Sequence, residues 1–234
     1  MPLACPLPPV IFFDAVGTLV HPEPSAPAVY AAIGRRFGSR LEEAQIALRF
    51  RAAFRRQEEA DYANGLRTSE EREIARWRAI VREVMDDVAD AEACFQALYA
   101  HFAGADAWCC VPETTEVLAT LAARGHALGI ASNFDQRLRS IVEQMPPLRP
   151  VRYLVISSEI GWRKPAVNFF VDMCQQAGAT ADQVLYVGDD PINDYEGGRS
   201  AGLRVLILEP DLQSTIPASE RIATLLDLRE VSRD

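Results

Sequence analysis

Residues 10–19 read VIFFDAVGTL, and the expected fold follows from them. Val10 to Phe13 form a short, continuously apolar run, which is typical of a strand buried on both faces in a parallel sheet. Asp14 follows this run directly, so a carboxylate is expected at the carboxyl end of the first strand, where open α/β sheets build their sites. The alternative is that Asp14 has only a structural role and caps the turn after the strand.

Four further apolar runs, at 127–131, 153–156, 184–187 and 204–208, predict more strands of the same buried kind. Helical segments are predicted between them. One begins after Pro112 and ends before Gly125, and another runs from Pro165 to Gly178, with proline near the start and glycine just past the end. Continuously apolar strands alternating with helices predict an α/β fold with a doubly wound parallel sheet.

Roughly 90 residues separate the first strand from the helix after Pro112, far more than a strand-to-helix connection needs. The turn at Asn64-Gly65 and a capping-box pattern at 68–71 predict the start of a helix, and at least three helices are expected. Apolar residues recur here at helical spacing; they are Ile74, Trp77, Val81, Val84, Phe95, Leu98 and Phe102. The predicted organisation is a core of residues 1–20 and 107–234 with a helical insert at 21–106.

Composition narrows the choice of partners and compartment. The formal net charge is −9 and the arginines are scattered among acids, which argues against nucleic acid and anionic membranes as partners. No apolar run approaches the roughly 18 residues of a membrane span, and no basic region precedes the first apolar stretch. Five cysteines without a CxxC pair indicate a reducing compartment, so a cytoplasmic protein is expected. Nothing distinguishes a monomer from an oligomer.

Polar residues follow two more of the predicted strands. Ser132-Asn133 ends the second strand, where a hydroxyl and backbone N–H groups can hold a phosphoryl oxygen. A helix cap is the structural alternative there. Lys164, just before Pro165, is placed where an ammonium group can offset the charge of a phosphate and of Asp14. A solvated surface lysine is the alternative.

The segment 187–194, VGDDPIND, is the most specific of these signals. Asp189, Asp190 and Asp194 place three carboxylates within six residues after a strand. Clustered oxygen ligands at a strand end suit a hard cation such as Mg²⁺. The structural alternative is an acidic turn in which Asp190 or Asp194 caps the next helix.

Taken in order, DAVGTL, SN, KP and GDDPIND resemble the four motifs of the haloacid dehalogenase superfamily, with a cap domain inserted after the first. The segments at 131–138, 157–170 and 186–194 are most similar to the subfamily named after haloacid dehalogenase-like hydrolase domain-containing protein 3. The resemblance covers essentially the whole chain. It implies a Rossmann-like core with an α-helical cap, and a Mg²⁺-dependent phosphohydrolase or phosphotransferase that acts on a small phosphorylated metabolite.

The resemblance also implies a role for each motif residue. Asp14 would attack phosphorus and form an aspartyl phosphate, with Mg²⁺ held by Asp14, the backbone carbonyl of Val16 and Asp189. Asp190 or Asp194 would be a supporting acid, and the motif leaves open which of them serves. The residues implied to orient and neutralise the phosphate are Thr18, Ser132, Asn133 and Lys164.

Val16 is a departure from the phosphatase pattern, because family phosphatases have an aspartate acid/base two residues after the nucleophile. Loss of a general acid/base costs roughly 10²- to 10⁴-fold in rate, so slow turnover is expected, with good leaving groups suffering least. His21, in the loop that leads into the insert, is a candidate for the missing proton transfer, and an ordinary loop histidine is the alternative.

Two further classes of protein are open alternatives. Superfamily 2-haloacid dehalogenases also replace that aspartate, but the acidic cluster at Asp189, Asp190 and Asp194 argues against them. A non-catalytic protein that binds a metal and a phosphorylated ligand, or a protein partner, would keep the same motifs. Phosphonate cleavage through a cap lysine is excluded because residues 21–110 contain no lysine.

Overall fold

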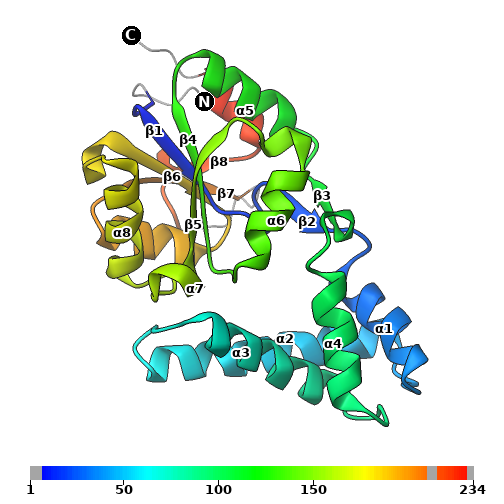
Figure 1. The fold of residues 1–234 in the computed structure, drawn as a ribbon. Helices are drawn as coiled ribbons and strands as arrows, with labels where there is room; N and C mark the ends of the chain where they lie inside the picture. Colours follow the sequence, from blue (N-terminus) through cyan, green and yellow to red (C-terminus); the bar gives the residue numbers. More distant parts are fainter. Residues whose placement is uncertain (1–6, 210–214, 231–234) are drawn as a thin grey trace.

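A six-stranded parallel sheet with the order β5-β4-β1-β6-β7-β8 forms the centre of the computed structural model, which describes residues 7–209 and 215–230 (Figure 1). Its strands are β1 (Val10–Phe13), β4 (Ala127–Ser132), β5 (Val151–Ile156), β6 (Val184–Gly188), β7 (Arg204–Leu208) and β8 (Arg221–Ile222). Because β1 pairs with β4 on one side and β6 on the other, the residue that follows β1 lies in the middle of one sheet edge.

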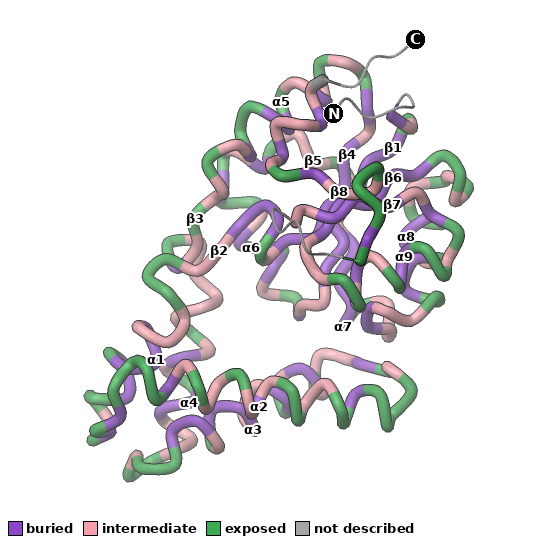
Figure 2. Tube along the Cα trace, turned by 180° about the vertical axis from the view of Figure 1, so that it is seen from behind, coloured by how far each residue is buried: buried purple, intermediate pink, exposed green. Residues whose placement is uncertain are grey.

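Helices cover both faces of the sheet, so successive residues of β1 are buried on opposite sides. Phe13 belongs to the apolar cluster shared with α5 (Thr114–Ala123) and α6 (Arg137–Gln144). Phe12 belongs to the cluster shared with α8 (Val167–Ala177). Burial on both faces explains why the strands are continuously apolar, and it confirms the predicted doubly wound sheet (Figure 2).

Four helices between β1 and α5 form a separate apolar cluster of their own. They are α1 (Ala26–Arg36), α2 (Glu43–Ala63), α3 (Glu70–Val84) and α4 (Ala91–His101). We call residues 26–101 the helical insert; it faces the carboxyl ends of the sheet strands (Figure 1). The prediction of at least three helices here is confirmed.

Two short antiparallel strands join the helical insert to the sheet. β2 (Val20–Pro22) leads into the insert and β3 (Trp108–Cys110) leads out of it, with Val20 opposite Cys110. Neither strand was predicted, because three residues are too few to establish a period along the sequence. β8, of two residues, was missed for the same reason.

The boundaries of the predicted elements hold with small shifts. α5 and α8 begin and end as the prolines and glycines predict, and β7 has the predicted bounds. The capping box predicted at 68–71 is wrong in detail: the N-cap of α3 is Ser69, whose hydroxyl accepts from the Arg72 backbone N–H. The Thr68 hydroxyl donates to Glu73 instead.

The short helices α7 (Ser157–Ile160) and α9 (Gly197–Ser200) complete the core, with the single turn of π-helix at Pro191–Glu196 directly before α9. Within residues 7–209 and 215–230, no helix is long and apolar enough to cross a membrane.

Candidate active site

Asp14 is buried at the carboxyl end of β1, where its backbone N–H donates to Val187 of the neighbouring strand at 2.8 Å. One oxygen of its carboxylate accepts a hydrogen bond from the Lys164 ammonium group at 2.8 Å. Lys164 comes from the segment before α8 and is only 3% exposed, so the alternative of a solvated surface lysine is wrong. The sheet therefore brings together two residues that are 150 positions apart.

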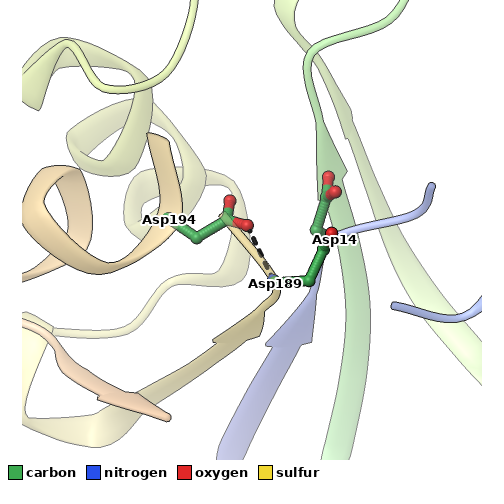
Figure 3. A group of neighbouring side chains, drawn as sticks. All are labelled: Asp14, Asp189 and Asp194. Carbon is green, nitrogen blue, oxygen red and sulfur yellow. Dashed lines mark hydrogen bonds between the residues drawn. The ribbon is translucent and has the colours of Figure 1, made fainter. Parts of the chain in front are cut away.

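Asp189 follows β6 and faces Asp14 across the sheet edge (Figure 3). Its Oδ1 accepts a hydrogen bond from the buried Thr18 hydroxyl at 2.9 Å. Gly17, three residues after Asp14, has a φ of +96°, and a Cβ at this position would overlap the Asp189 carboxylate. The loop after β1 therefore needs glycine both for its left-handed backbone and for the close approach of the carboxylate.

Asp194 lies at the same site and is fully buried. Its Oδ1 accepts from Lys164 at 2.6 Å, and its Oδ2 accepts from the Asp190 backbone N–H at 3.0 Å. The same Oδ2 accepts from the Asp189 backbone N–H at 3.0 Å (Figure 3). A Cβ at Gly188 would overlap this carboxylate. Asp194 thus holds the lysine and shapes the loop that carries Asp189.

Asp190 has a different set of contacts. Its carboxylate accepts from the backbone N–H groups of Ile192 and Asn193, both at 2.8 Å, as an N-terminal cap. The sequence left Asp190 and Asp194 as equal candidates for the supporting acid. The geometry separates them, because Asp194 contacts Lys164 and Asp190 caps the following turn.

Ser132 and Asn133 lie at the end of β4, beside β1. Ser132 is buried, and its hydroxyl opposes in small part the rise in the Asp14 pKa that burial causes. Asn133 does not cap a helix; its side chain donates to the Lys164 carbonyl at 3.0 Å and accepts from the Lys164 N–H at 2.8 Å. Both predicted residues therefore reach the site, and Asn133 does so by holding the backbone of the lysine.

The site holds more negative than positive charge. Burial raises the pKa of Asp14, an effect that Lys164 opposes and Asp194 strengthens. Burial and the Asp14 and Asp194 carboxylates raise the pKa of Asp189 to about 7. For Lys164, burial alone would lower the pKa, but the neighbouring carboxylates outweigh it and raise the pKa above its usual value. The lysine is therefore charged, and it balances one of the three carboxylates.

The donor set fits a hard divalent cation. Asp14, Asp189 and Asp194 each offer a carboxylate oxygen, and these atoms lie within 4.8 Å of one another. Both oxygens of Asp194 already accept hydrogen bonds, so Asp14 and Asp189 are the better-placed side-chain ligands. A divalent cation would offset the excess negative charge that raises the pKa of Asp14 and Asp189.

Val16 lies beside the candidate site, whereas His21 is partly exposed in β2. Val16 is half-buried and lines a cavity between the sheet edge and the helical insert. His21 is in β2, where its ring lies 3.9 Å from the Glu23 carboxylate and its side chain is 43% exposed. An exposed ion pair of this kind agrees with the ordinary loop histidine rather than with proton transfer.

Two sets of residues near the site were missed from the sequence. Tyr186 was counted only as an apolar strand residue, yet its hydroxyl accepts from Lys164 and donates to the Ala131 carbonyl, both at 2.8 Å. A hydroxyl in an otherwise aliphatic strand was the available signal. Arg163, next to Lys164, forms buried ion pairs with Asp61 and Glu73 of the insert, and no local pattern announces such a contact.

Most of this chain also matches a known protein family. The family model described as haloacid dehalogenase-like hydrolase matches residues 8–202. The chain belongs to this hydrolase family. The motif-based predictions of a haloacid dehalogenase-type hydrolase and of its Rossmann-like core are thereby confirmed.

The chain is similar to individual proteins in sequence and in structure. Haloacid dehalogenase-like hydrolase domain-containing protein 3 of Danio rerio is 26% identical over 203 residues, covering 85% of this chain and 84% of that protein, as the subfamily resemblance predicted. Phosphoglycolate phosphatase of Rhodospirillum rubrum is 28% identical over 208 residues, covering 86% and 80%. L-2-haloacid dehalogenase from Xanthobacter autotrophicus superposes with a TM-score of 0.71 at 16% identity over 95% of this chain and 97% of that chain, which shows a shared fold alone.

Proposed function

We propose that this family hydrolase is a Mg²⁺-dependent phosphohydrolase that acts on a small phosphorylated metabolite through an aspartyl phosphate on Asp14. The observation that carries the proposal is the buried Asp14 carboxylate, held by Lys164 at 2.8 Å and facing Asp189 at a sheet edge. A nucleophile held beside a cation, with oxygen ligands opposite, is the arrangement that phosphoryl transfer needs. The similarity to a phosphoglycolate phosphatase supports it.

In the first step, an Asp14 oxygen forms a bond to phosphorus while the bond from phosphorus to the ester oxygen breaks. Lys164 and Ser132 neutralise and orient the phosphoryl oxygens, and Thr18 keeps Asp189 in place. Asp14, Asp189 and the Val16 carbonyl would hold Mg²⁺, which when bound would neutralise charge at the phosphoryl group. In the second step, water adds to phosphorus, the bond to Asp14 breaks, and inorganic phosphate leaves.

Val16 cannot donate a proton to the departing alcohol or accept one from the attacking water. The departing oxygen therefore takes its proton from solvent, and turnover is slow for poor leaving groups. We assign residues 1–20 and 107–234 to the catalytic core and 21–106 to a cap that limits access of water to the site. The proposed phosphate-binding residues are Lys164, Ser132 and Asn133. The proposed compartment is the cytoplasm.

The test is phosphate release from acetyl phosphate and p-nitrophenyl phosphate, with Mg²⁺ and with a chelator, by the native protein, Asp14→Asn and Val16→Asp. We expect Mg²⁺-dependent release that falls by more than roughly 10³-fold in Asp14→Asn. Val16→Asp should raise the rate by roughly 10-fold or more, because it restores a general acid/base. Absence of release by the native protein with either compound would favour the non-catalytic binding protein instead.

A 2-haloacid dehalogenase is the second candidate that shares the fold. Its reaction displaces a halide, leaves no charged phosphoryl group to neutralise and gives no role to a cluster of carboxylates. Asp189 and Asp194 beside Asp14 therefore favour the phosphohydrolase. Halide release from 2-chloropropionate that is independent of Mg²⁺ would reverse this preference.

A further inference from the structure

A cavity of about 320 Å³ lies between the helical insert and the sheet edge. On the side of the sheet it is lined by Val16, two residues after Asp14, and by Asn133, directly after Ser132. An ester whose phosphate reaches Asp14 would therefore place its organic part in this cavity. A cavity of roughly 150 Å³ holds a benzene ring, so the available volume suits one or two rings.

Seven of the fifteen residues that line the cavity are aromatic. Their rings contact one another: Tyr30 and Phe50 meet edge to face at 5.5 Å, Phe50 and Phe54 stack at 6.1 Å, and Trp108 and Phe134 meet at 5.8 Å. Rings that already pack together need little rearrangement to receive a flat apolar group. The wall is therefore suited to an aromatic ligand.

Carboxylates of this chain neutralise the arginines of the cavity wall. Arg137 pairs with Asp135 at 2.8 Å, and Asp135 is fully buried. Arg163 lies 3.3 Å from Asp61 and also pairs with Glu73. Because each arginine has a carboxylate partner, the wall offers no unbalanced positive charge to a second anionic group on a ligand.

Arg76 is the third arginine of the wall, and its charge is also neutralised by an acid of this chain, Asp61. Its side chain is 3% exposed, pairs with Asp61 through Nη1, and lies 4.8 Å over the Phe54 ring. Its Nη2 is buried and has no hydrogen-bond partner in the part of the chain that the structure describes. Because Nη2 has almost no accessible surface, it adds no polar contact to the cavity wall.

We infer that the substrates are phosphate monoesters of an uncharged one- or two-ring aromatic alcohol. The inference rests on the proposed function and names its substrate class. It disfavours compact esters that carry a carboxylate as a second anionic group, such as phosphoglycolate.

Aryl phosphate esters also suit a site in which Val16 replaces the general acid/base. A phenol ionises near a pKa of about 10, whereas an alcohol ionises near that of water, about 16. When the bond from phosphorus to an aryl oxygen breaks, the electron pair stays on a stable phenolate, which takes its proton from solvent afterwards. A side chain that cannot donate a proton therefore costs an aryl ester less than an alkyl ester.

The test is calorimetric binding of phosphonates, whose carbon–phosphorus bond the proposed reaction does not break, to the Asp14→Asn variant with Mg²⁺. The probes are 1-naphthylmethylphosphonate, methylphosphonate and phosphonoacetate, the last carrying a carboxylate. We expect the naphthyl probe to bind at least roughly 10-fold more tightly than either other probe. A naphthyl probe that binds no more tightly than phosphonoacetate would overturn the inference.

A matched pair of variants on α1 links the effect to the cavity. Ala26 lines the cavity, and Ala28, two residues along the same helix and also half-buried, does not. Ala26→Phe should fill the cavity and lower the preference for the naphthyl probe at least roughly 10-fold, while Ala28→Phe should keep it. An equal loss in both variants would contradict the assignment of the binding site.

Turnover measurements separate this inference from the proposed function. If acetyl phosphate is hydrolysed in an Asp14-dependent way but 1-naphthyl phosphate has a lower kcat/KM than phosphoglycolate, the substrate class is wrong and the phosphohydrolase stands. If the naphthyl probe binds as expected but no phosphate ester is hydrolysed, the cavity is supported as an aromatic binding site and the phosphohydrolase is wrong.

Discussion

At the scale of single residues, Asp189 shows what burial among like charges does to a carboxylate. Burial and the neighbouring Asp14 and Asp194 raise its pKa to about 7, from an ordinary value of 3.8. The folded protein therefore binds the proton more tightly than the unfolded chain does. This contribution to stability is complete below pH 4 and is lost as the pH rises toward 7.

We predict that Asp189→Asn stabilises the metal-free protein at pH 8 and has little effect at pH 4. The shift of about three pKa units sets an upper bound of about 4 kcal/mol for the gain at pH 8. Thermal unfolding across this pH range, in the presence of a chelator, measures it. Asp182→Asn, on the surface, is the matched control, and a gain that is the same at every pH would contradict the prediction.

At the scale of elements, the loop between α2 and α3 docks on the segment that carries Lys164. The Thr68 N–H donates to the Gly161 carbonyl at 3.2 Å, and the Arg163 N–H donates to the Leu66 carbonyl at 2.9 Å. The Arg67 guanidinium lies 4.2 Å over the Trp162 ring. These contacts tie the helical insert to the segment that carries Lys164. The buried Asp61 beside them pairs with three arginines.

We predict that Asp61→Ala destabilises the fold by about 3–5 kcal/mol, because it leaves Arg76 and Arg163 buried with too few partners. The control is Asp86→Ala, which removes an exposed partner of Arg49 and should cost less than about 1 kcal/mol. Urea denaturation measures both free energies of unfolding. Equal losses would mean that the buried network does not hold the insert to the core.

At the scale of the whole molecule, the site joins side chains from four separate stretches of the chain: the ends of β1, β4 and β6 and the segment before α8. Metal binding at this meeting point should therefore stabilise the entire core. At a Mg²⁺ concentration 100 times its dissociation constant, the expected gain is about 2.7 kcal/mol. For a chain of this size that is a rise of roughly 5–10 °C in Tm.

Thermal unfolding with Mg²⁺ and with a chelator measures this gain. The double variant Asp14→Asn, Asp189→Asn should lose the dependence on Mg²⁺, because it removes both proposed side-chain ligands. Asp182→Asn should keep it. A rise in Tm that persists in the double variant would place the stabilising ion elsewhere.

The sequence alone determined five of the six strands of the sheet, the helical insert, the family and most residues of the candidate site. Strands buried on both faces must be continuously apolar, prolines and glycines mark helix ends, and a parallel sheet brings the residues after its strands to one edge. Asp14, Ser132, Lys164 and Asp189 could be found for that reason. Their proposed roles came from the resemblance.

Only the tertiary structure decided which partner each polar group has. Asp190 and Asp194 are equivalent in the sequence, and only folding aims Asp194 at Lys164 while Asp190 caps a turn. The pairing of Arg163 with Asp61, and the aromatic cavity beside Val16, join residues from distant elements. Such contacts depend on how helices pack in space, and the periodicity of a single segment carries information only about which of its faces is buried.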